Sequence, residues 1–319
     1  MKTNNITITY LSKVSLASLN GSDKEVDNIN PIKKVTLQNG EELPYVSSQA
    51  IRRALRDKIK ELGYPISPVG QSSTDKGAPK TALDPIKYID DDLFGYMDAK
   101  AGSDGEGGTS DVRTSPIRVE SLLALATYKG DLDYATNFMG KGLKDSKGKP
   151  IQPNIFETEI HSGVYRGTVL IELDRIGIEH QVEEVKEGKK IVARNLVAKE
   201  LVDNNEKAKR VLAFIDALQM LWSSGRQSRF LADISPKFVA AALMKSKNPI
   251  FLESVVLDEK GQVNLEQLNT VASDYERFID KHLFAVQESV FEKKDGMISL
   301  KEGFEAIQTW VKSYYSVQL

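Results

Sequence analysis

The sequence predicts an α+β fold, a sandwich of the ferredoxin-like kind in which helices cover one face of an antiparallel sheet. Residues 6–19 alternate polar and apolar side chains with the period of a strand, whereas residues 47–63 place apolar side chains at the spacing of a helix. Strand-like and helix-like segments then alternate to the end of the chain. Two polar stretches interrupt this order and indicate insertions.

The first predicted elements are a strand over 6–19, a hairpin and a helix. In KKVTLQNGEELPYV (33–46), Asn39-Gly40 lies between two strand-like runs, and this dipeptide tolerates the positive φ angles of a two-residue turn. Ser47 and Ser48 can then cap a helix that Gly63 ends. Its apolar face consists of Ile51, Leu55, Ile59 and Leu62.

The two insertions are predicted over 64–111 and 129–162. They contain PISPVGQSSTDKGAPK (65–80), AGSDGEGG (101–108) and KGLKDSKGKPIQP (141–153), which hold too few apolar residues to build a core alone. Between them we expect a helix over 117–128, because Val119, Leu122, Leu123 and Ala126 keep helical spacing.

The C-terminal half predicts a further series of strands and helices. Residues 164–180 have strand character, and 206–225 form an amphipathic helix that turns Val211, Ile215, Leu218 and Trp222 inward and ends at Gly225. Strands are expected at 237–245 and 250–257, and a last helix at 303–315.

Composition excludes several kinds of chemistry. The 319 residues contain no Cys and three widely spaced His, so disulfides, thiolate catalysis and Cys-ligated zinc are excluded. We find no phosphate-binding loop or dinucleotide fingerprint, and we expect neither a cofactor nor a metal. No apolar run could cross a bilayer, and no signal peptide is evident, so a cytoplasmic protein is expected. The net charge of −2 leaves local basic patches to carry any nucleic-acid binding.

The first candidate site is the predicted helix start at Ser47, Ser48 and Gln49, followed by Arg52 and Arg53. Free N–H groups, hydroxyls, the helix dipole and two guanidinium groups together suit an anion such as an RNA phosphate. The alternative is a well-capped helix with a solvated basic face.

The second candidate site is the loop SSGRQSR (223–229), which contains Gly225, Arg226, Gln227, Ser228 and Arg229. Glycine permits close approach of a ligand, and two arginines with Ser and Gln can hold phosphates or stack on bases. The alternative is an ordinary helix end with basic residues that favour the dipole.

Two further motifs are less specific. The acidic run Asp90-Asp91-Asp92, with Asp84, lacks the ligand spacing of a cation site and is expected to be a solvated turn. His161 has no neighbouring nucleophile, so we expect a structural or RNA-contacting role.

Five stretches, in their order and spacing, resemble the backbone subunit of type I CRISPR Cascade complexes, the Cas-seven family, and its DevR-type group of I-B systems. They are ITITYLSKVSLASLNG, NPIKKVTLQNGEELPYVSSQAIRRALRD, TSPIRVESLLALATYKG, NIFETEIHSGVYRGTVLIELDRIG and LQMLWSSGRQSRFLADISPKFVAAALM. The resemblance implies a hand-shaped protein. Its RRM-like palm would comprise 1–63, 112–128 and 163–319, its finger 64–111 and its thumb 129–162.

The resemblance also implies a non-catalytic subunit of an antiviral defence system, which oligomerises along guide RNA and presents the spacer for pairing with target DNA. Its partners would be crRNA, further copies of itself and other Cascade subunits, and either a helicase-nuclease or transposition proteins could join them. The residues implied to contact RNA are Ser47, Ser48, Gln49, Arg52, Arg53 and Gly225 to Arg229. Because no RNP1-like string occurs, stacking of bases on the sheet is not expected.

Two alternatives to this function stay open. The first is a metal-dependent ribonuclease of the type III kind, with Asp84, Asp90 or Asp111 as its acidic residue. The second is an RNA-binding regulator, although no helix-turn-helix is evident.

Overall fold

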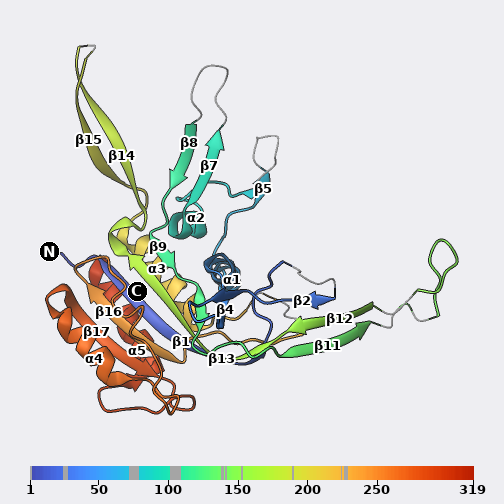
Figure 1. Cartoon of the computed structure of the whole chain (residues 1–319). Coiled ribbons are helices and arrows are strands. Elements are labelled where there is room, and N and C mark those ends of the chain that lie inside the picture. The colour runs from blue at the N-terminus through green and yellow to red at the C-terminus, as the bar shows by residue number, and fades with distance from the viewer. Residues whose placement is uncertain are drawn as a thin grey trace.

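The computed structural model describes the chain except residues 1, 24–27, 72–78, 101–108, 138–139, 141, 152–153, 189, 224 and 226–228. A sheet of nine strands forms its centre, in the order β18-β17-β16-β1-β13-β10-β4-β3, with β9 also paired to β13 (Figure 1). Within this sheet, β17 and β18 pair in parallel and the other pairs are antiparallel. The fold is therefore α+β, as predicted, but with a mixed sheet. The strands are β1 (Asn5–Ala17), β3 (Lys34–Thr36), β4 (Glu42–Val46), β9 (Ile117–Val119), β10 (Leu122–Ala124), β13 (His161–Glu172), β16 (Phe238–Met244), β17 (Ile279–Val286) and β18 (Ile298–Ser299).

Strand β1 is the central strand and confirms the strand predicted over 6–19. It pairs with β13 on one side and with β16 on the other. Ile8 and Tyr10 belong to the larger core cluster, whereas Leu11 belongs to a second cluster on the opposite face of the sheet. Side chains of β1 thus contribute to two separate cores, because successive side chains of a strand point to opposite faces of the sheet.

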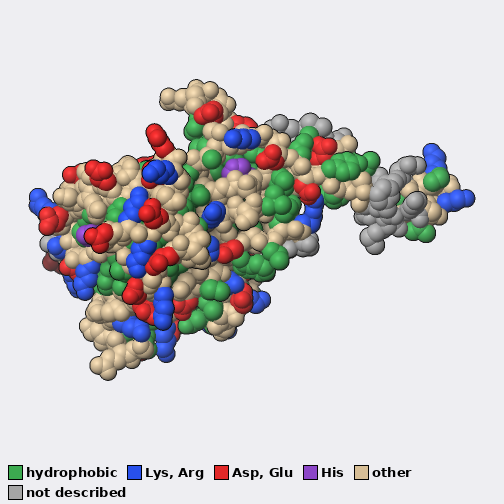
Figure 2. All heavy atoms as spheres, turned by 90° about the horizontal axis from the view of Figure 1, so that it is seen from below, with side chains coloured by type: hydrophobic (Ala, Val, Ile, Leu, Met, Phe, Trp, Pro, Cys, Tyr) green, Lys and Arg blue, Asp and Glu red, His purple; other side chains and the backbone are tan. Residues whose placement is uncertain are grey.

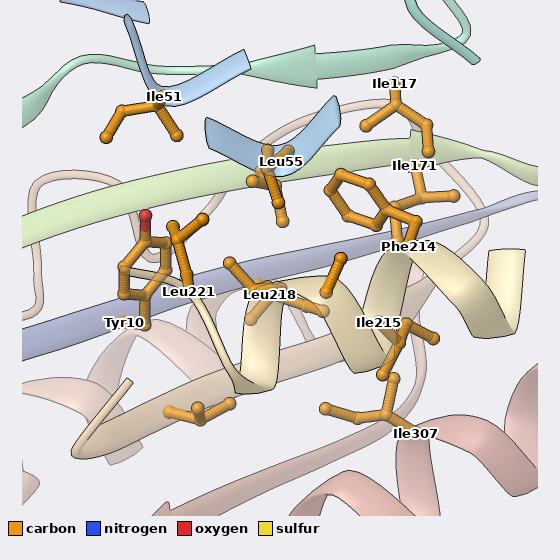
Figure 3. Close-up of a cluster of buried hydrophobic side chains, with 14 of the residues drawn as sticks. Tyr10, Ile51, Leu55, Ile117, Ile171, Phe214, Ile215, Leu218, Leu221 and Ile307 are labelled. Atoms are coloured by element: carbon orange, nitrogen blue, oxygen red, sulfur yellow. The ribbon is translucent and has the colours of Figure 1, made fainter. Parts of the chain in front are cut away.

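Three helices cover the first face. They are α1 (Ser48–Glu61), α3 (Asn204–Gln219) and α5 (Leu300–Tyr315), and the short α2 (Ile89–Phe94) packs against the same core. Figure 3 shows Leu55 of α1 and Phe214 of α3 near Ile171 of the sheet, and Ile307 of α5 next to Ile215 of α3. The predicted helix over 47–63 is confirmed, including its end at Gly63, whose φ of +91° stops the helix.

The opposite face is covered only in part. Helix α4 (Leu265–Asp274) and the turns before it pack against β16 and β17, where Phe238 and Phe284 lie in the second core. Beside this lobe, a groove of about 610 Å³ lies over β13, β10, β4 and β3. This groove and helix α1 therefore lie on opposite faces of the sheet.

Hairpins project from this body (Figure 1). They pair β7 with β8, β11 with β12 and β14 with β15, and β2 adds to β12 in parallel. A small ladder joins β5 and β6, and two 3-10 turns complete the elements of the described residues. The bounds are β2 (Ile29–Asn30), β5 (Gly70–Gln71), β6 (Pro79–Lys80), β7 (Tyr96–Lys100), β8 (Thr109–Arg113), β11 (Leu132–Asn137), β12 (Asn154–Glu159), β14 (Ile178–Glu187), β15 (Lys190–Glu200), η1 (Leu173–Arg175) and η2 (Glu276–Phe278).

The predicted helix over 117–128 is wrong, because this segment forms strands β9 and β10. Leu122 and Ala124 are buried in the helix-side core, while Leu123 between them lines the groove on the other face. When a strand has apolar residues on both faces, their spacing can resemble that of a helix. Here the segment is a strand because β10 pairs with β13 and β4.

The predicted strand over 250–257 is also wrong. Residues 250–254 form consecutive turns that bury Ile250 and Phe251 in the second core, so the apolar run reflects burial without a strand. The hairpin at Asn39-Gly40 exists as β3–β4, but its loop spans 37–41 instead of two residues.

Helix α3 ends at Gln219, earlier than the predicted end at Gly225. Trp222, expected on its inward face, therefore lies beyond the helix and is 37% exposed. The strand predicted at 237–245 and the helix predicted at 303–315 are confirmed as β16 and α5. Among the described residues, no helix is long and apolar enough to span a membrane.

Candidate nucleic-acid interface

The start of α1 is capped as its sequence predicts. The Oγ of Ser47 accepts a hydrogen bond from the Ala50 N–H at 3.4 Å. The Ser47 N–H donates to Oδ1 of Asn20 at 2.9 Å, and the Ser48 N–H donates to Oγ of Ser121 at 3.2 Å. Three backbone donors of this start are therefore used within the chain. An anion would meet mainly side-chain donors here.

The arginines of α1 divide into two groups. Arg52 is half-buried and donates to the carbonyl oxygen of Phe94 in α2, and its guanidinium carbon lies 5.5 Å from the Phe94 ring centre. Burial, with the nearby charge of Arg56, lowers the pKa of Arg52. Arg53 is exposed and pairs with Asp57 at 3.0 Å. With the exposed Gln49, Arg53 is the solvent-facing part of this motif.

The second motif approaches the end of β1. A Cβ placed on Gly225 would lie 2.5 Å from the carbonyl oxygen of Leu19, which is closer than any side chain tolerates. The Gly225 N–H donates to Oγ of Ser223 at 3.1 Å. Glycine is thus required here for close backbone approach. Arg226, Gln227 and Ser228 lie outside the described residues.

Leu19 and Asn20 bring the two motifs together. Leu19 approaches Gly225, and the adjacent Asn20 accepts the hydrogen bond from the Ser47 N–H. The two predicted sites, far apart in the sequence, therefore meet at one end of the central strand. Nothing in the sequence near Asn20 identifies Ser47 as its partner.

Arg229 joins the second motif to the hairpin β11–β12. It pairs with Asp133, and its Nη1 donates to Oγ1 of Thr158 at 3.2 Å. Its guanidinium carbon lies 5.2 Å from the ring centre of Phe156 and 5.4 Å from that of Phe230. Arg229 therefore holds the base of the hairpin in the free chain. A phosphate at this position would compete with Asp133.

His161 lies in the interior at the start of β13, with 6% of its surface exposed. Its Nδ1 is hydrogen-bonded to the Tyr165 hydroxyl at 2.7 Å, and the two rings meet edge to face. Burial lowers the pKa of His161, partly opposed by the charge of Asp131. The neutral ring is favoured in the folded state.

The acidic run is buried, and the expectation of a solvated turn is wrong. Asp90, Asp91 and Asp92 are at most 1% exposed and form the first turn of α2. Asp92 accepts hydrogen bonds from Arg210 at 2.8 Å, from the Gly177 N–H at 3.0 Å and from Arg113. This arrangement could not be predicted from the sequence, because the donors to Asp92 come from elements far away along the chain.

Asp90, and Asp84 before the run, are also engaged. Asp90 accepts from the Ser67 N–H at 2.7 Å and pairs with Arg56 at 3.3 Å, and burial raises the pKa of Asp90. Asp84 accepts from the backbone N–H groups of Ile86 and Lys87. No cluster of three or more potential metal-ligating side chains occurs in the part of the chain that the structure describes.

Comparisons with known proteins give one family match and two similar solved structures. The model of a family described as "CRISPR-associated negative auto-regulator DevR/Csa2" matches residues 8–265. One similar solved structure is a chain of a "CRISPR RNA-guided surveillance complex, pre-nicking", with a TM-score of 0.63 at 15% identity over 96% of this chain and 100% of that one. Another, from a "CRISPR RNA-guided surveillance complex", has a TM-score of 0.55 at 16% identity over 96% and 99%. Comparison with curated proteins gives no match. At such identities the structural likeness concerns the fold.

Proposed function

Because the chain belongs to the DevR/Csa2 family of CRISPR-associated proteins, we propose that it is a guide-RNA-binding backbone subunit of a CRISPR surveillance complex. Copies would assemble along crRNA, beside other Cascade subunits, and would present the spacer for pairing with target DNA. The family match over residues 8–265 carries this proposal. The fold shared with chains of two RNA-guided surveillance complexes supports it.

The sheet topology supports an RRM-like palm. Strand β1, helix α1, strands β9 and β10, strand β13, helix α3 and strand β16 follow one another along the chain. In the sheet, β16 neighbours β1, β1 neighbours β13, and β13 neighbours β9 and β10. This is the fourth-first-third-second arrangement that a β-α-β-β-α-β unit gives when its two helices pack on one face. The hairpins β7–β8 and β11–β12 would then serve as finger and thumb.

The meeting of α1 and the Gly225 loop supports a site that holds RNA backbone. Gln49 and Arg53 offer exposed donors on one side, and on the other side the loop that contains Gly225 packs closely against Leu19. Contacts of this kind position a nucleic acid without reading its sequence, which base pairing by the guide would supply.

We also propose that the subunit does not cleave RNA. Two of the carboxylates considered for a ribonuclease are already engaged, Asp90 with Arg56 and Ser67, and Asp84 with the backbone of its own turn. Neither can turn toward a bound metal without losing these hydrogen bonds.

The test is to express the tagged chain with a repeat-spacer transcript, purify it, and sequence the bound RNA. Enrichment of repeat-flanked small RNA is expected, and RNA no different from that on an unrelated tagged protein would overturn the proposal. The purified complex is then incubated with complementary RNA and magnesium. Intact RNA is expected, whereas cuts at regular intervals would support the ribonuclease alternative.

A further inference from the structure

The open face of the central sheet carries a continuous groove beside helix α4 and the turns before it. Its main part, about 610 Å³, lies over β13, β10, β4 and β3, and a smaller hollow of about 190 Å³ continues it along β9. Glu120, Thr168 and Leu252 line both parts. On β13 the lining residues are Arg166, Thr168 and Leu170, at every second position, so they share one face. They span about 14 Å, the length of about four residues of extended chain.

One end of the groove has outward negative charge. The side chain of Arg166 is 11% exposed and pairs with Glu253 at 2.8 Å, whereas the Glu253 side chain is 79% exposed. The half-buried Lys34 pairs with Glu159 at 2.8 Å. Glu120 is exposed and forms no ion pair in the part of the chain that the structure describes. The cations here are thus withdrawn and neutralised, while two carboxylates face the solvent.

The other end of the groove has an excess of positive charge. Arg118, Arg175 and Lys247 share two carboxylates, those of Glu172 and Asp174. Glu172 is buried, so it is not itself available to a ligand. The Arg118 side chain is 61% exposed and lines the smaller hollow. An incoming carboxylate can therefore bind Arg118 while Arg175 and Lys247 still neutralise Glu172.

The surface between the two ends is apolar. Leu123 and Leu252 line the main part of the groove, and Val119 and Leu170 line the smaller hollow. A surface with opposite charges at its ends and apolar side chains between them is complementary to an extended segment with the reverse arrangement, basic at one end and acidic at the other.

Protein suits this groove better than nucleic acid. RNA phosphates would meet the exposed carboxylates of Glu120 and Glu253. Figure 2 shows acidic and basic side chains interspersed over the face of the body that it displays, without a broad field of positive charge. The projecting segments of this chain are paired two by two, as hairpins β7–β8, β11–β12 and β14–β15. A single extended segment is therefore supplied more readily by another protein than by a second copy.

We propose that this groove docks an extended segment of a different protein. Its Lys or Arg side chains would lie near Glu120 and Glu253, and its apolar side chains over Leu123 and Leu252. A carboxylate at its other end would lie near Arg118. The inference goes beyond the proposed function and does not require RNA, because the groove and α1 lie on opposite faces of the sheet.

The test uses two labelled hexapeptides with blocked ends that differ only in the sign of their charges, Lys-Leu-Lys-Val-Ser-Glu and Glu-Leu-Glu-Val-Ser-Lys. Fluorescence anisotropy is expected to show that the parent chain binds the first about tenfold more tightly, since several exposed ion pairs become repulsions in the second. Glu120→Lys should remove or reverse this preference. The matched control is Glu305→Lys on α5, whose native side chain is 61% exposed and which should leave the preference unchanged.

A third peptide, the first with Gln in place of Glu, tests the basic end. It should bind the parent chain more weakly than the first peptide does. Arg118→Ala should bind these two peptides alike, because the partner of the carboxylate is gone. Equal loss in the parent chain and in Arg118→Ala would overturn this part of the assignment. Thermal melting confirms that each variant is folded.

The outcomes separate this inference from the proposed function. Failure of the parent chain to bind either charged peptide, equal affinity for both, or the same response of Glu120→Lys and Glu305→Lys overturns the docking. Self-association of the free chain that the first peptide reverses would assign the groove to a second copy, and displacement of the peptide by guide RNA would assign it to RNA; either result overturns the docking as well. Failure of the parent chain to bind guide RNA would count against the proposed function and leave this inference standing.

Discussion

At the residue scale, the arginines of α1 have different roles although they are neighbours in sequence. Arg52 contacts Phe94 and helps to attach α2, whereas Arg53 has only an exposed pair with Asp57 among the described residues. An exposed ion pair of this kind contributes about 0–1 kcal/mol, so a phosphate can displace Asp57 at little cost.

Arg53→Ala is therefore expected to weaken RNA binding and to leave the melting temperature nearly unchanged. A lost phosphate contact should make the slope of log affinity against log salt shallower by about 0.7 units for a single strand. Arg52→Ala is the comparison, and it should lower the melting temperature because it removes a partly buried contact. An unchanged slope for Arg53→Ala would leave α1 as a capped helix with a solvated basic side.

Gly225 is expected to tolerate no side chain. Gly225→Ala would place a Cβ 2.5 Å from the Leu19 carbonyl oxygen, so the loop or the end of β1 must move. We expect reduced RNA affinity, measured by titration, together with a lower melting temperature. Gly70→Ala is the matched control, since nothing lies within 4 Å of its Cβ position. Equal behaviour of the two variants would contradict the close approach.

His161 predicts an acid sensitivity of folding. Burial lowers its pKa in the folded chain, so protons bind preferentially to the unfolded chain. Above the ordinary His pKa of about 6.5 the lowered pKa of His161 does not change the free energy of unfolding. As the pH falls below that value, the free energy of unfolding decreases. Urea unfolding above and below this pH should give a smaller pH effect for His161→Asn than for the parent chain. Parallel losses in both would contradict this.

At the scale of elements, Asp92 joins parts of the chain that the sequence separates. It lies in α2 and binds Arg210 of α3, Arg113 at the end of β8 and the Gly177 N–H before β14. The segment predicted as the first insertion is therefore attached to the body through a buried ionic cluster. A similar contact in the second segment is that of Arg229 with Asp133.

Asp92→Ala is expected to lower the free energy of unfolding by about 3–5 kcal/mol, because it leaves the buried guanidinium of Arg113 without a counter-charge and that of Arg210 with Glu206 alone. Denaturant unfolding provides the measurement. The matched control is Glu305→Gln, which removes an exposed pair with Lys301 at 3.8 Å and should cost less than about 1 kcal/mol. A loss for Asp92→Ala as small as the control's would indicate that the cluster relaxes into water.

A helix or strand could be predicted from the sequence where its apolar residues follow one clear period. Strand β1, helix α1 and helix α5 carry clear periodicity, and Ser47 caps α1 as its sequence indicates. The prediction for 117–128 failed because β10 has apolar side chains on both faces. The exposed hairpin β14–β15 lacks a buried face, so no period marks it.

The candidate site could be predicted only as separate pieces. Residue type and local order identify the helix start and the glycine loop, but their meeting at Leu19 and Asn20 depends on the strand between them. The burial of Asp90 to Asp92 was missed for the same reason. Their partners come from elements far along the chain, and such long-range contacts cannot be predicted from local sequence.

At the scale of the whole molecule, the hairpins extend well beyond the core. Hairpin β11–β12 extends to one side of the sheet, and β7–β8 and β14–β15 project elsewhere (Figure 1). A shape with separate projecting surfaces suits contacts between unlike faces of successive copies, which do not close after two.

The number of copies bound should therefore follow the length of the guide. If each copy holds a fixed stretch of RNA backbone, lengthening the spacer should add copies one at a time, in steps of one 35.4 kDa subunit. Complexes reconstituted on a series of guides and measured by native mass spectrometry would show this ladder. The matched control is the same series with Arg53→Ala, which should keep the step size while requiring more protein or less salt for each addition, because phosphate contacts are weakened and not the contact between copies. A constant stoichiometry across guide lengths would rule out assembly along RNA, even if single copies bind it tightly.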